Sequence, residues 1–152
     1  MTKLNLPEYQ FNIKQTKNGL QIFDRLRQRF VALTPEEWVR QHFVNYLIEE
    51  KQYPLALMGN EISLELNGVK RRCDTLVAAR DGSPLAVVEY KAPTITINQT
   101  TFDQIARYNM VLHAKCLMVS NGLNHYCCLM DNQQDSYVFL QDIPLYPTLL
   151  TL

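Results

Sequence analysis

Three apolar stretches separated by two turn signals constrain the fold of this chain most strongly. The stretches are residues 61–66, 69–79 and 85–91, and the turn signals are Asn67-Gly68 and Asp81-Gly82-Ser83-Pro84. Short apolar runs bounded by such turns are typical of β-strands. Consecutive strands joined by tight turns pair in antiparallel fashion. The sequence therefore predicts an antiparallel meander in the middle of the chain.

Two helices are predicted, one on each side of this meander in the sequence. Thr34 suits the N-cap position, Pro35 fits the first helical position, and Glu37 follows three residues after the cap, as in a capping box. Apolar residues then recur at helical spacing until Pro54, which cannot continue a helix. A second helix is predicted for residues 101–113, again from apolar residues at helical spacing.

Further strands are predicted near both ends of the chain. Residues 8–14 and 20–23 flank Asn18-Gly19, a pair that supplies the positive φ angles of a tight hairpin, so we expect an N-terminal β-ribbon. Three more strands are expected after the second helix, at residues 115–120, 125–130 and 136–140. Pro144 and Pro147 then predict a loose tail.

Composition limits the classes of protein to which the chain can belong. Hydrophobic residues make up 47% of the 152 residues, enough for one core of ordinary size, so we expect a single domain over residues 1–152. Fifteen basic and fifteen acidic residues cancel, so any contact with nucleic acid would depend on local patches. No signal peptide and no apolar run of about 18 residues is present, which favours a cytoplasmic location without a membrane partner.

The cysteines and histidines do not form a metal-binding pattern. The four cysteines lie in apolar, strand-like runs without CxxC spacing, and the three histidines are scattered along the chain. Small buried thiols are ordinary in such strands. We therefore expect the cysteines to belong to the core, and we do not expect a structural zinc site.

Asp74 and Glu89 are predicted to face each other on neighbouring strands. Side chains alternate between the two faces of a sheet, and a two-residue loop at Asp81-Gly82 places Asp74 directly opposite Glu89. Lys91 then lies on the same face. A four-residue loop keeps all three residues on this face, whereas an odd loop or a bulge would separate them.

This predicted cluster of two carboxylates and one ammonium group points to metal chemistry. Facing carboxylates repel each other at neutral pH, and a hard divalent cation relieves the repulsion, so we expect Mg²⁺. A bound Mg²⁺ polarises a phosphoryl oxygen and lowers the pKa of a bound water, while Lys91 neutralises charge or orients that water. The alternative is a plain ion pair of Lys91 with Asp74 or Glu89 at a sheet edge.

These residues resemble a known group of nucleases. Asp74, followed fifteen residues later by Glu89-Tyr90-Lys91 and then by a helix with Gln104 and Tyr108, is similar to the PD-(D/E)xK nuclease superfamily with its QxxxY helix. More narrowly, the chain resembles the N-terminal nuclease domain of type I restriction enzyme motor subunits over about residues 30–145. Five segments carry this resemblance in order: Leu33 to Gln41, Arg72-Cys73-Asp74, Val88 to Pro93, Gln104 to Asn109, and Ser120-Asn121-Gly122.

The resemblance implies a fold, an activity and a cofactor. The expected fold is α/β, with a restriction-endonuclease-like core of order αβββαβ in which helices flank a central mixed sheet. The core would span about residues 33–141, with residues 1–32 as an N-terminal β-ribbon extension and extra strands at the C-terminal end. The expected activity is Mg²⁺-dependent hydrolysis of DNA phosphodiester bonds, with Mn²⁺ as a substitute for Mg²⁺.

The resemblance also assigns roles to single residues. It implies that Asp74 and Glu89 are metal ligands, that Lys91 is the catalytic lysine, and that Gln104 and Tyr108 support the DNA or the active site. A spacing of four places Gln104 and Tyr108 on one face of their helix. Without the resemblance, this face could equally be an ordinary solvated helix surface. Cys73 stands where the superfamily name has proline, a position that only sets strand geometry.

A further acidic ligand and several basic contacts remain open. Some members of the superfamily use an acidic residue of the first helix, for which Glu36 and Glu37 are candidates, and we take Glu37 as a third metal ligand; its alternative role is in the capping box. Glu61 is a further candidate. Phosphate contacts are expected from basic residues near the site, although such a cluster can also be a solvated face. These residues are Lys70, Arg71, Arg72 and Arg107.

The chain contains no phosphate-binding glycine loop, so we do not expect it to translocate DNA by itself. A translocase or specificity subunit is therefore an expected partner besides DNA, and a homodimer would allow both strands to be cut. One alternative function is a nucleic-acid-binding or assembly module that keeps the nuclease fold and is inactive without a partner. Another is a resemblance in fold only, with the charged triad as a structural ion-pair network.

Overall fold

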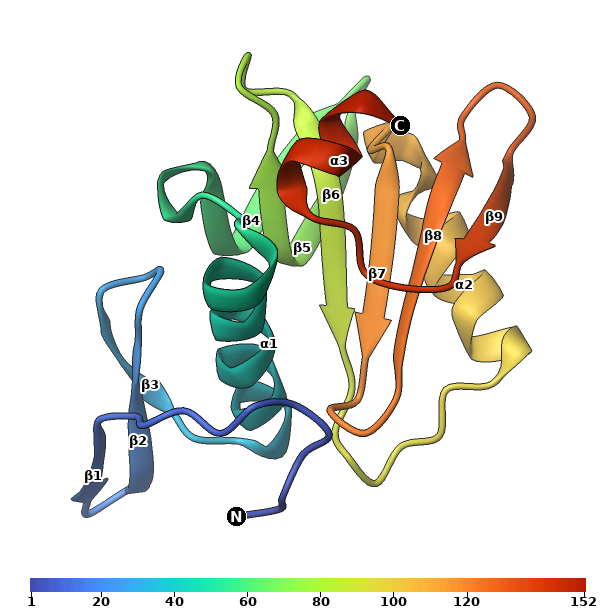
Figure 1. The fold of residues 1–152 in the computed structure, drawn as a ribbon. Helices are drawn as coiled ribbons and strands as arrows, with labels where there is room; N and C mark the ends of the chain where they lie inside the picture. Colours follow the sequence, from blue (N-terminus) through green and yellow to red (C-terminus); the bar gives the residue numbers. More distant parts are fainter.

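A six-stranded mixed sheet forms the centre of the computed structural model, which describes residues 1–152 (Figure 1). In spatial order the strands are β4 (Met58–Leu66), β5 (Val69–Ala78), β6 (Pro84–Tyr90), β7 (Cys116–Ser120), β8 (His125–Asp131) and β9 (Ser136–Leu140). Only β6 and β7 pair in parallel, and all other neighbours are antiparallel. The predicted meander is confirmed as β4, β5 and β6.

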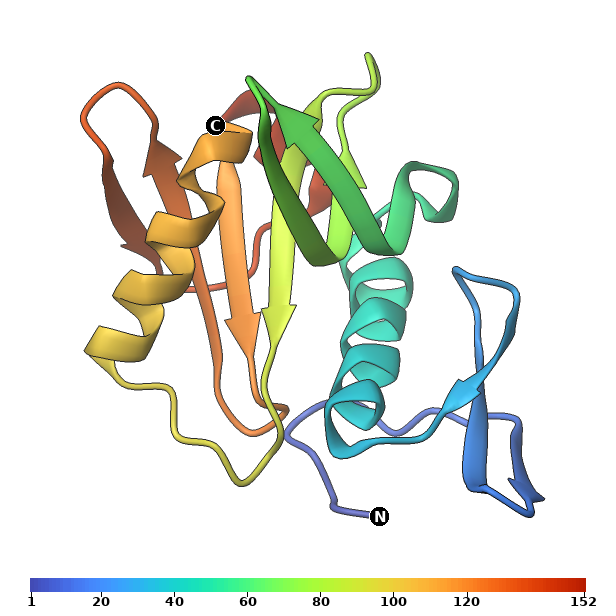
Figure 2. The same ribbon diagram turned by 180° about the vertical axis from the view of Figure 1, so that it is seen from behind.

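Helices cover both faces of this sheet (Figures 1 and 2). One face carries α1 (Pro35–Lys51) and α3 (Tyr146–Thr151), and the other carries α2 (Gln99–Asn109), which continues into the 3₁₀ turn η2 (Met110–Leu112). A second 3₁₀ turn, η1 (Leu55–Leu57), links α1 to β4. The order α1, β4, β5, β6, α2, β7 confirms the expected αβββαβ core. None of the helices is long and apolar enough to cross a membrane.

The start of α1 follows from its capping residues. The Thr34 hydroxyl accepts a hydrogen bond from the Glu37 main-chain N–H (3.0 Å), and Pro35 occupies the first turn. Only this half of the capping box forms, because the Glu37 carboxylate bonds to arginines instead. The helix ends at Gln52, which has a left-handed backbone (φ 64°), shortly before Pro54.

Alternate residues of the central strands belong to two separate apolar clusters, one on each face of the sheet. On the α1 side, Val88 of β6 packs in a cluster with Phe43. On the α2 side, its neighbour Val87 packs in a cluster with Phe102. Both strand residues are fully buried, as expected for a sheet covered on both faces. The four cysteines are buried and free, which confirms that they belong to the core.

The hairpin between β5 and β6 has the predicted strand register, but its loop and its pairing near the loop differ from the prediction. The Ala79 N–H donates to the Ser83 carbonyl (2.8 Å), so the loop has three residues rather than two. A bulge between Val77 and Ala78 then shifts the pairing by one residue. The extra loop residue and the bulge shift the register in opposite directions, so Thr75 pairs with Val88 as in the predicted register. Continued by one residue, this register sets Asp74 opposite Glu89.

Two peripheral predictions need correction. The N-terminal ribbon has a third strand that was not predicted, so it is a small antiparallel sheet of β1 (Ile13–Thr16), β2 (Gly19–Asp24) and β3 (Arg29–Ala32). The predicted loose tail is wrong, because its residues form α3. Tyr146 and Leu149 of this helix are buried in the core, and the Tyr146 hydroxyl donates to the Ala78 carbonyl (3.1 Å).

Candidate active site

A cleft of about 400 Å³ lies where the carboxyl end of β6 meets α2 and the first turn of α1. Most of the residues that line it are polar, and most were candidates from the sequence. They are Glu36, Asp74, Glu89, Tyr90, Lys91, Gln104, Ile105, Tyr108 and Asn109. The structure therefore brings together the predicted acidic pair, the lysine and the two helix residues, as the sequence predicts.

Asp74 enters this cleft because of its position on β5. Leu76 of β5 pairs with Val87 of β6, and both pack on the α2 side of the sheet. Two residues further along, Asp74 and Glu89 fall on the same side. The Asp74 Oδ2 atom accepts a hydrogen bond from the main-chain N–H of Tyr90 (2.9 Å), which ties the carboxylate to the end of β6.

Glu89 carries the strongest sign of an incomplete site. Its Oε1 atom is buried and has no hydrogen-bond partner. Burial, together with the nearby Asp74 carboxylate, raises the pKa of Glu89 to about 9, although the neighbouring side chain of Asn109 opposes the shift. A buried acid beside a second acid favours its neutral form unless a cation is present. The acidic pair is therefore electrostatically suited to hold a cation.

Lys91 is half-buried beside the two acids. Its main-chain N–H donates to the Ser120 carbonyl (2.9 Å), which fixes the residue just beyond the end of β6. None of the ion pairs in the structure involves Lys91, Asp74 or Glu89. The plain ion pair considered as the alternative is therefore not formed, and the ammonium group is free to meet a ligand.

The face of α2 that borders the cleft is exposed at Gln104 and Tyr108. The opposite face buries Phe102 and Ala106 in the core, so the two surfaces of the helix are cleanly divided. The guanidinium group of Arg71 lies over the Tyr108 ring, 4.4 Å from its centroid, and donates to the Tyr108 carbonyl (2.7 Å). Of this stacked pair, Tyr108 lines the cleft and Arg71 packs against it at the cleft mouth.

The structure separates Glu37 from the cleft and brings its neighbour Glu36 there instead. The Glu37 carboxylate accepts hydrogen bonds from Arg27 (2.7 Å), Arg40 (3.0 Å) and Gln41 (2.8 Å). These donors saturate its oxygens, so we no longer assign Glu37 as a metal ligand. Adjacent residues of a helix point about 100° apart, and the sequence did not fix which of the two would face the sheet end.

Arg40 lies directly behind Asp74, a role that sequence reasoning missed. Its Nη1 atom donates to the main-chain carbonyl of Asp74 (2.7 Å), and its Nη2 atom donates to Glu61 (2.8 Å) and Glu37 (3.0 Å). Burial would lower the pKa of Arg40, but these carboxylates outweigh it and raise the pKa. The polar residues that lie between Val39 and Phe43 in α1 are the sequence signal that could have predicted a buried polar role for Arg40.

Glu61 joins this buried network to the molecular surface. It lies on β4 opposite Asp74 and has a left-handed backbone (φ 56°), which is unfavourable for a residue with a side chain. Its carboxylate bridges buried Arg40 and exposed Arg72. These two ion pairs offset the backbone cost, and Glu61 acts here as an anchor rather than as a cleft residue.

A separate series of hydrogen bonds links the N-terminal ribbon to β4, β5 and β6. Asp24 of β2 accepts from Asn60 (3.1 Å), and Asn60 accepts from the Thr75 hydroxyl (2.6 Å), which also bonds to the Tyr90 hydroxyl (2.8 Å). Burial alone would raise the pKa of Asp24, but hydrogen bonds from Arg27 and Asn60 lower it. The ribbon therefore supports the strand residues next to Asp74 and Glu89.

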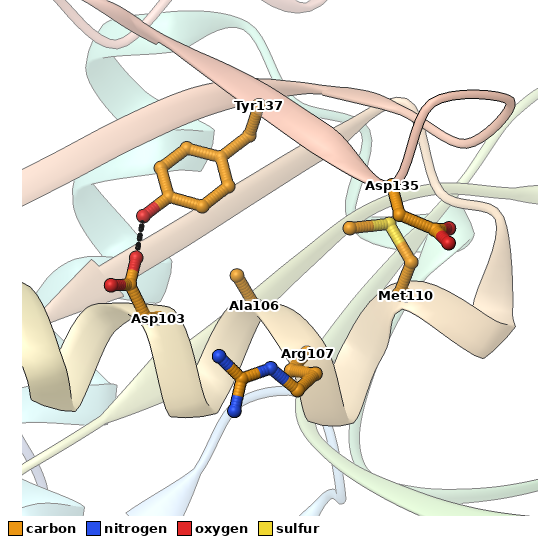
Figure 3. A pocket seen from close by; sticks show the side chains of 6 residues that line it. All are labelled: Asp103, Ala106, Arg107, Met110, Asp135 and Tyr137. Carbon is orange, nitrogen blue, oxygen red and sulfur yellow. Dashed lines mark hydrogen bonds between the residues drawn. The ribbon is translucent and has the colours of Figure 1, made fainter.

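The predicted phosphate-contacting residues do not all lie together. Lys70, Arg71 and Arg72 follow one another on β5, and Arg71 reaches the cleft mouth through Tyr108. Arg107, in contrast, lines a separate pocket of about 540 Å³ between α2 and β9, in which the Tyr137 hydroxyl bonds to Asp103 (Figure 3). The structure does not bring Arg107 to the acidic pair.

The oxygen atoms of the cleft fit Mg²⁺ better than a softer metal. No group of three or more His, Cys, Asp or Glu side chains converges closely enough to enclose an ion. Mg²⁺ commonly binds through one or two carboxylates and fills its other positions with water and substrate phosphate. Two carboxylates, with one oxygen of Glu89 unpartnered, match this requirement.

Residues 35–144 match the family described as the type I restriction enzyme R protein N terminus. The chain belongs to this family. The match begins at the first residue of α1 and includes every residue that lines the cleft, but it leaves out the N-terminal ribbon and α3. No curated protein matches the chain. The family match confirms the resemblance drawn from the sequence and points to a nuclease-like module.

Proposed function

We propose that this R-protein N-terminal domain hydrolyses phosphodiester bonds of DNA with Mg²⁺ as cofactor. The observation that carries the proposal is the meeting of Asp74, Glu89 and Lys91 in one cleft without any ion pair among them. Charges that are half-buried and unpaired cost stability, so their presence favours a functional role over a structural one.

The side chains divide the chemistry between them. Asp74 and Glu89 would hold Mg²⁺, which supplies Lewis-acid polarisation and an activated water when it is bound. Lys91 places its ammonium group beside the reacting phosphate, where it stabilises the negative charge that develops in the transition state. Gln104 and Tyr108 hold the strand to be cut at the cleft mouth by hydrogen bonding and stacking.

DNA would approach along the β5 side of the cleft. Arg71 is a candidate for a phosphate contact because its guanidinium group stacks on Tyr108, which lines the cleft, and the exposed side chains of Lys70 and Arg72 extend the basic surface. Arg107 keeps its predicted DNA contact only if the path continues over α2, since it lines a different pocket. These contacts position the DNA and carry no sequence information by themselves.

The test measures DNA cleavage and Mn²⁺ binding by the wild type and by Asp74→Ala. We expect the wild type to cut DNA with Mg²⁺ or Mn²⁺ and to bind Mn²⁺ in a titration calorimeter, and we expect Asp74→Ala to lose both. Glu65→Gln, which removes an exposed carboxylate elsewhere on β4, is the matched control and should behave as the wild type does. Equal cleavage by wild type and Asp74→Ala would refute the proposal.

A partner-dependent nuclease is the second candidate, and one observation favours it. The chain has no net charge, because its fifteen acidic residues balance its fifteen basic ones, so it has no overall positive field to attract DNA. A translocase or specificity subunit would then supply the DNA affinity, and a homodimer would supply a second active site. Cleavage of DNA by the purified chain alone would exclude this dependence.

A further inference from the structure

Asn109, the last residue of α2, lines the cleft and is only 3% exposed. Its Nδ2 atom donates to the Ile105 carbonyl one turn earlier (2.9 Å), which fixes the plane of the amide. Its Oδ1 atom is buried and has no hydrogen-bond partner. Buried side-chain oxygens in folded proteins are nearly always bonded, so this oxygen calls for a ligand.

A second residue of the same cleft also has a buried oxygen without a hydrogen-bond partner. Four buried side-chain polar atoms in the structure lack a partner, on Tyr9, Glu89, Asn109 and Asn132, and two of the four residues line the candidate active site. Asn109 and Glu89 line the same cleft. Two residues with an unpartnered buried oxygen, Glu89 of β6 and Asn109 of α2, therefore lie in the same cleft.

We propose that Oδ1 of Asn109 is a third oxygen ligand of the divalent cation, an inference that rests on the proposed function. Amide oxygens are hard donors of the kind that Mg²⁺ and Mn²⁺ accept. Two carboxylates already match the charge of a divalent ion, so a neutral third donor completes the set without excess negative charge. This donor would supply a third oxygen in a cleft where no three His, Cys, Asp or Glu side chains converge closely enough to enclose an ion.

The competing role for Asn109 is to orient Glu89 through an amide N–H. The two roles predict opposite results for Asn109→Asp. A carboxylate keeps an oxygen donor and adds negative charge, so a ligand role predicts Mn²⁺ binding at least as tight as in the wild type. The same change removes every N–H donor and places a third acid beside Glu89, so an orienting role predicts weaker binding.

Calorimetric titration with Mn²⁺ of the wild type, Asp74→Ala, Asn109→Ala and Asn109→Asp tests the assignment. We expect Asn109→Ala to weaken Mn²⁺ binding about 10–100-fold, and Asn109→Asp to retain or improve it. Asn132→Ala is the matched control, because Asn132 also donates through Nδ2 to a main-chain carbonyl and has an unpartnered Oδ1, but lies outside the cleft. It should bind Mn²⁺ as the wild type does.

The outcomes distinguish failure of the proposed function from failure of the Asn109 ligand assignment. If the wild type binds no Mn²⁺ in an Asp74-dependent manner, the proposed function itself fails. If it does bind, and a folded Asn109→Ala binds equally well, the ligand assignment is overturned. Thermal unfolding in EDTA establishes that each variant is folded. Should Asn109→Ala fail to fold, Asn109→Asp decides alone: weakened binding in a folded Asn109→Asp overturns the assignment, and retained binding supports it.

Discussion

Two groups of charged and polar side chains lie back to back across β5, and they differ in how their charges are satisfied. On the α1 side, Glu37, Arg40 and Glu61 form a buried network in which each charged group has its partners. On the α2 side, Asp74, Glu89 and Lys91 share a cleft and form no ion pair. The main chain of Asp74 belongs to the first group, and its side chain belongs to the second.

This difference indicates which charged groups stabilise the fold and which are left unpaired for ligand binding and catalysis. A buried ion pair stabilises the folded chain only when every partner is present, so the α1 side acts as a rigid support. The α2 side instead keeps its acids close together, at a cost that a bound cation would relieve. Changes on the α1 side should therefore reduce stability most, whereas changes on the α2 side should affect ligand binding and catalysis.

The largest effect is expected for Arg40→Met. The change leaves the carboxylates of Glu37 and Glu61 without their shared partner and frees the Asp74 carbonyl. We expect a loss of about 3–5 kcal/mol in the free energy of unfolding, as for other broken buried pairs. Urea unfolding followed by circular dichroism measures it.

Arg25→Ala is the control for Arg40→Met. The Arg25–Glu49 pair lies on the surface, with the two side chains 39% and 51% exposed, so its loss should cost less than about 1 kcal/mol. Losses of equal size in the two variants would break the proposed contrast between supporting and exposed charges.

The next effect is expected for Lys91→Ala, on catalysis rather than on folding. Lys91 has no ion-pair partner to leave behind, so the fold and Mn²⁺ binding should change little. DNA cleavage should fall by about 100-fold or more, because the transition state loses its ammonium group. Single-turnover cleavage assays measure this loss, and normal cleavage by the variant would remove the catalytic role from Lys91.

A smaller, pH-dependent effect is expected for Glu89→Gln in the absence of metal. Between the ordinary pKa of 4.5 and the folded value of about 9, the unfolded chain releases the Glu89 proton and the folded chain retains it. Stability of the wild type therefore falls across this range as pH rises, and the glutamine variant escapes the fall. We expect the variant to melt several degrees higher at pH 8 and nearly equally at pH 4.

Thermal melts in EDTA at several pH values test this expectation for Glu89. Because the comparison is between variant and wild type at each pH, titration of other groups cancels to first order. A constant difference across the pH range would show that Glu89 is not held in its neutral form beside Asp74.

The smallest effect is expected for Arg71→Ala, on DNA affinity. Arg71 stacks on Tyr108 at the cleft mouth, and its loss should weaken binding about 2–5-fold at moderate salt. Arg107→Ala is the natural comparison, because Arg107 lines the pocket beside β9. Fluorescence anisotropy with labelled DNA measures both, and a larger loss for Arg107→Ala would relocate the DNA path over α2.

Local patterns predicted the arrangement of the central residues of the cleft. Asp74 and Glu89 were placed opposite each other by the two-residue periodicity of strands, and Thr34 and Pro35 marked the start of α1. The predicted register survived although the loop has three residues, because the bulge at Val77 and Ala78 restored it. The register held because the apolar residues around Asp74 must keep their faces against the two helices.

Contacts between distant segments were not predictable in the same way. Arg40 is fixed by Glu61 and by the Asp74 carbonyl, both far from it in sequence. Glu36, rather than Glu37, faces the cleft because Arg27 of the N-terminal ribbon engages Glu37. The tail became α3 because the open end of the core could bury Tyr146 and Leu149.

The sequence by itself determined most of the helices and strands, the meander and the shared face of Asp74, Glu89 and Lys91, because these depend on periodicity and turn chemistry within short stretches. Only the tertiary structure decided which polar groups would be paired and which would stay free. Pairing depends on how α1, α2 and the ribbon pack on the sheet, since burial makes each unmet charge or oxygen costly. Asn109 shows this most clearly: as a residue in a helix it is unremarkable, and its place beside Glu89 gives its oxygen a role.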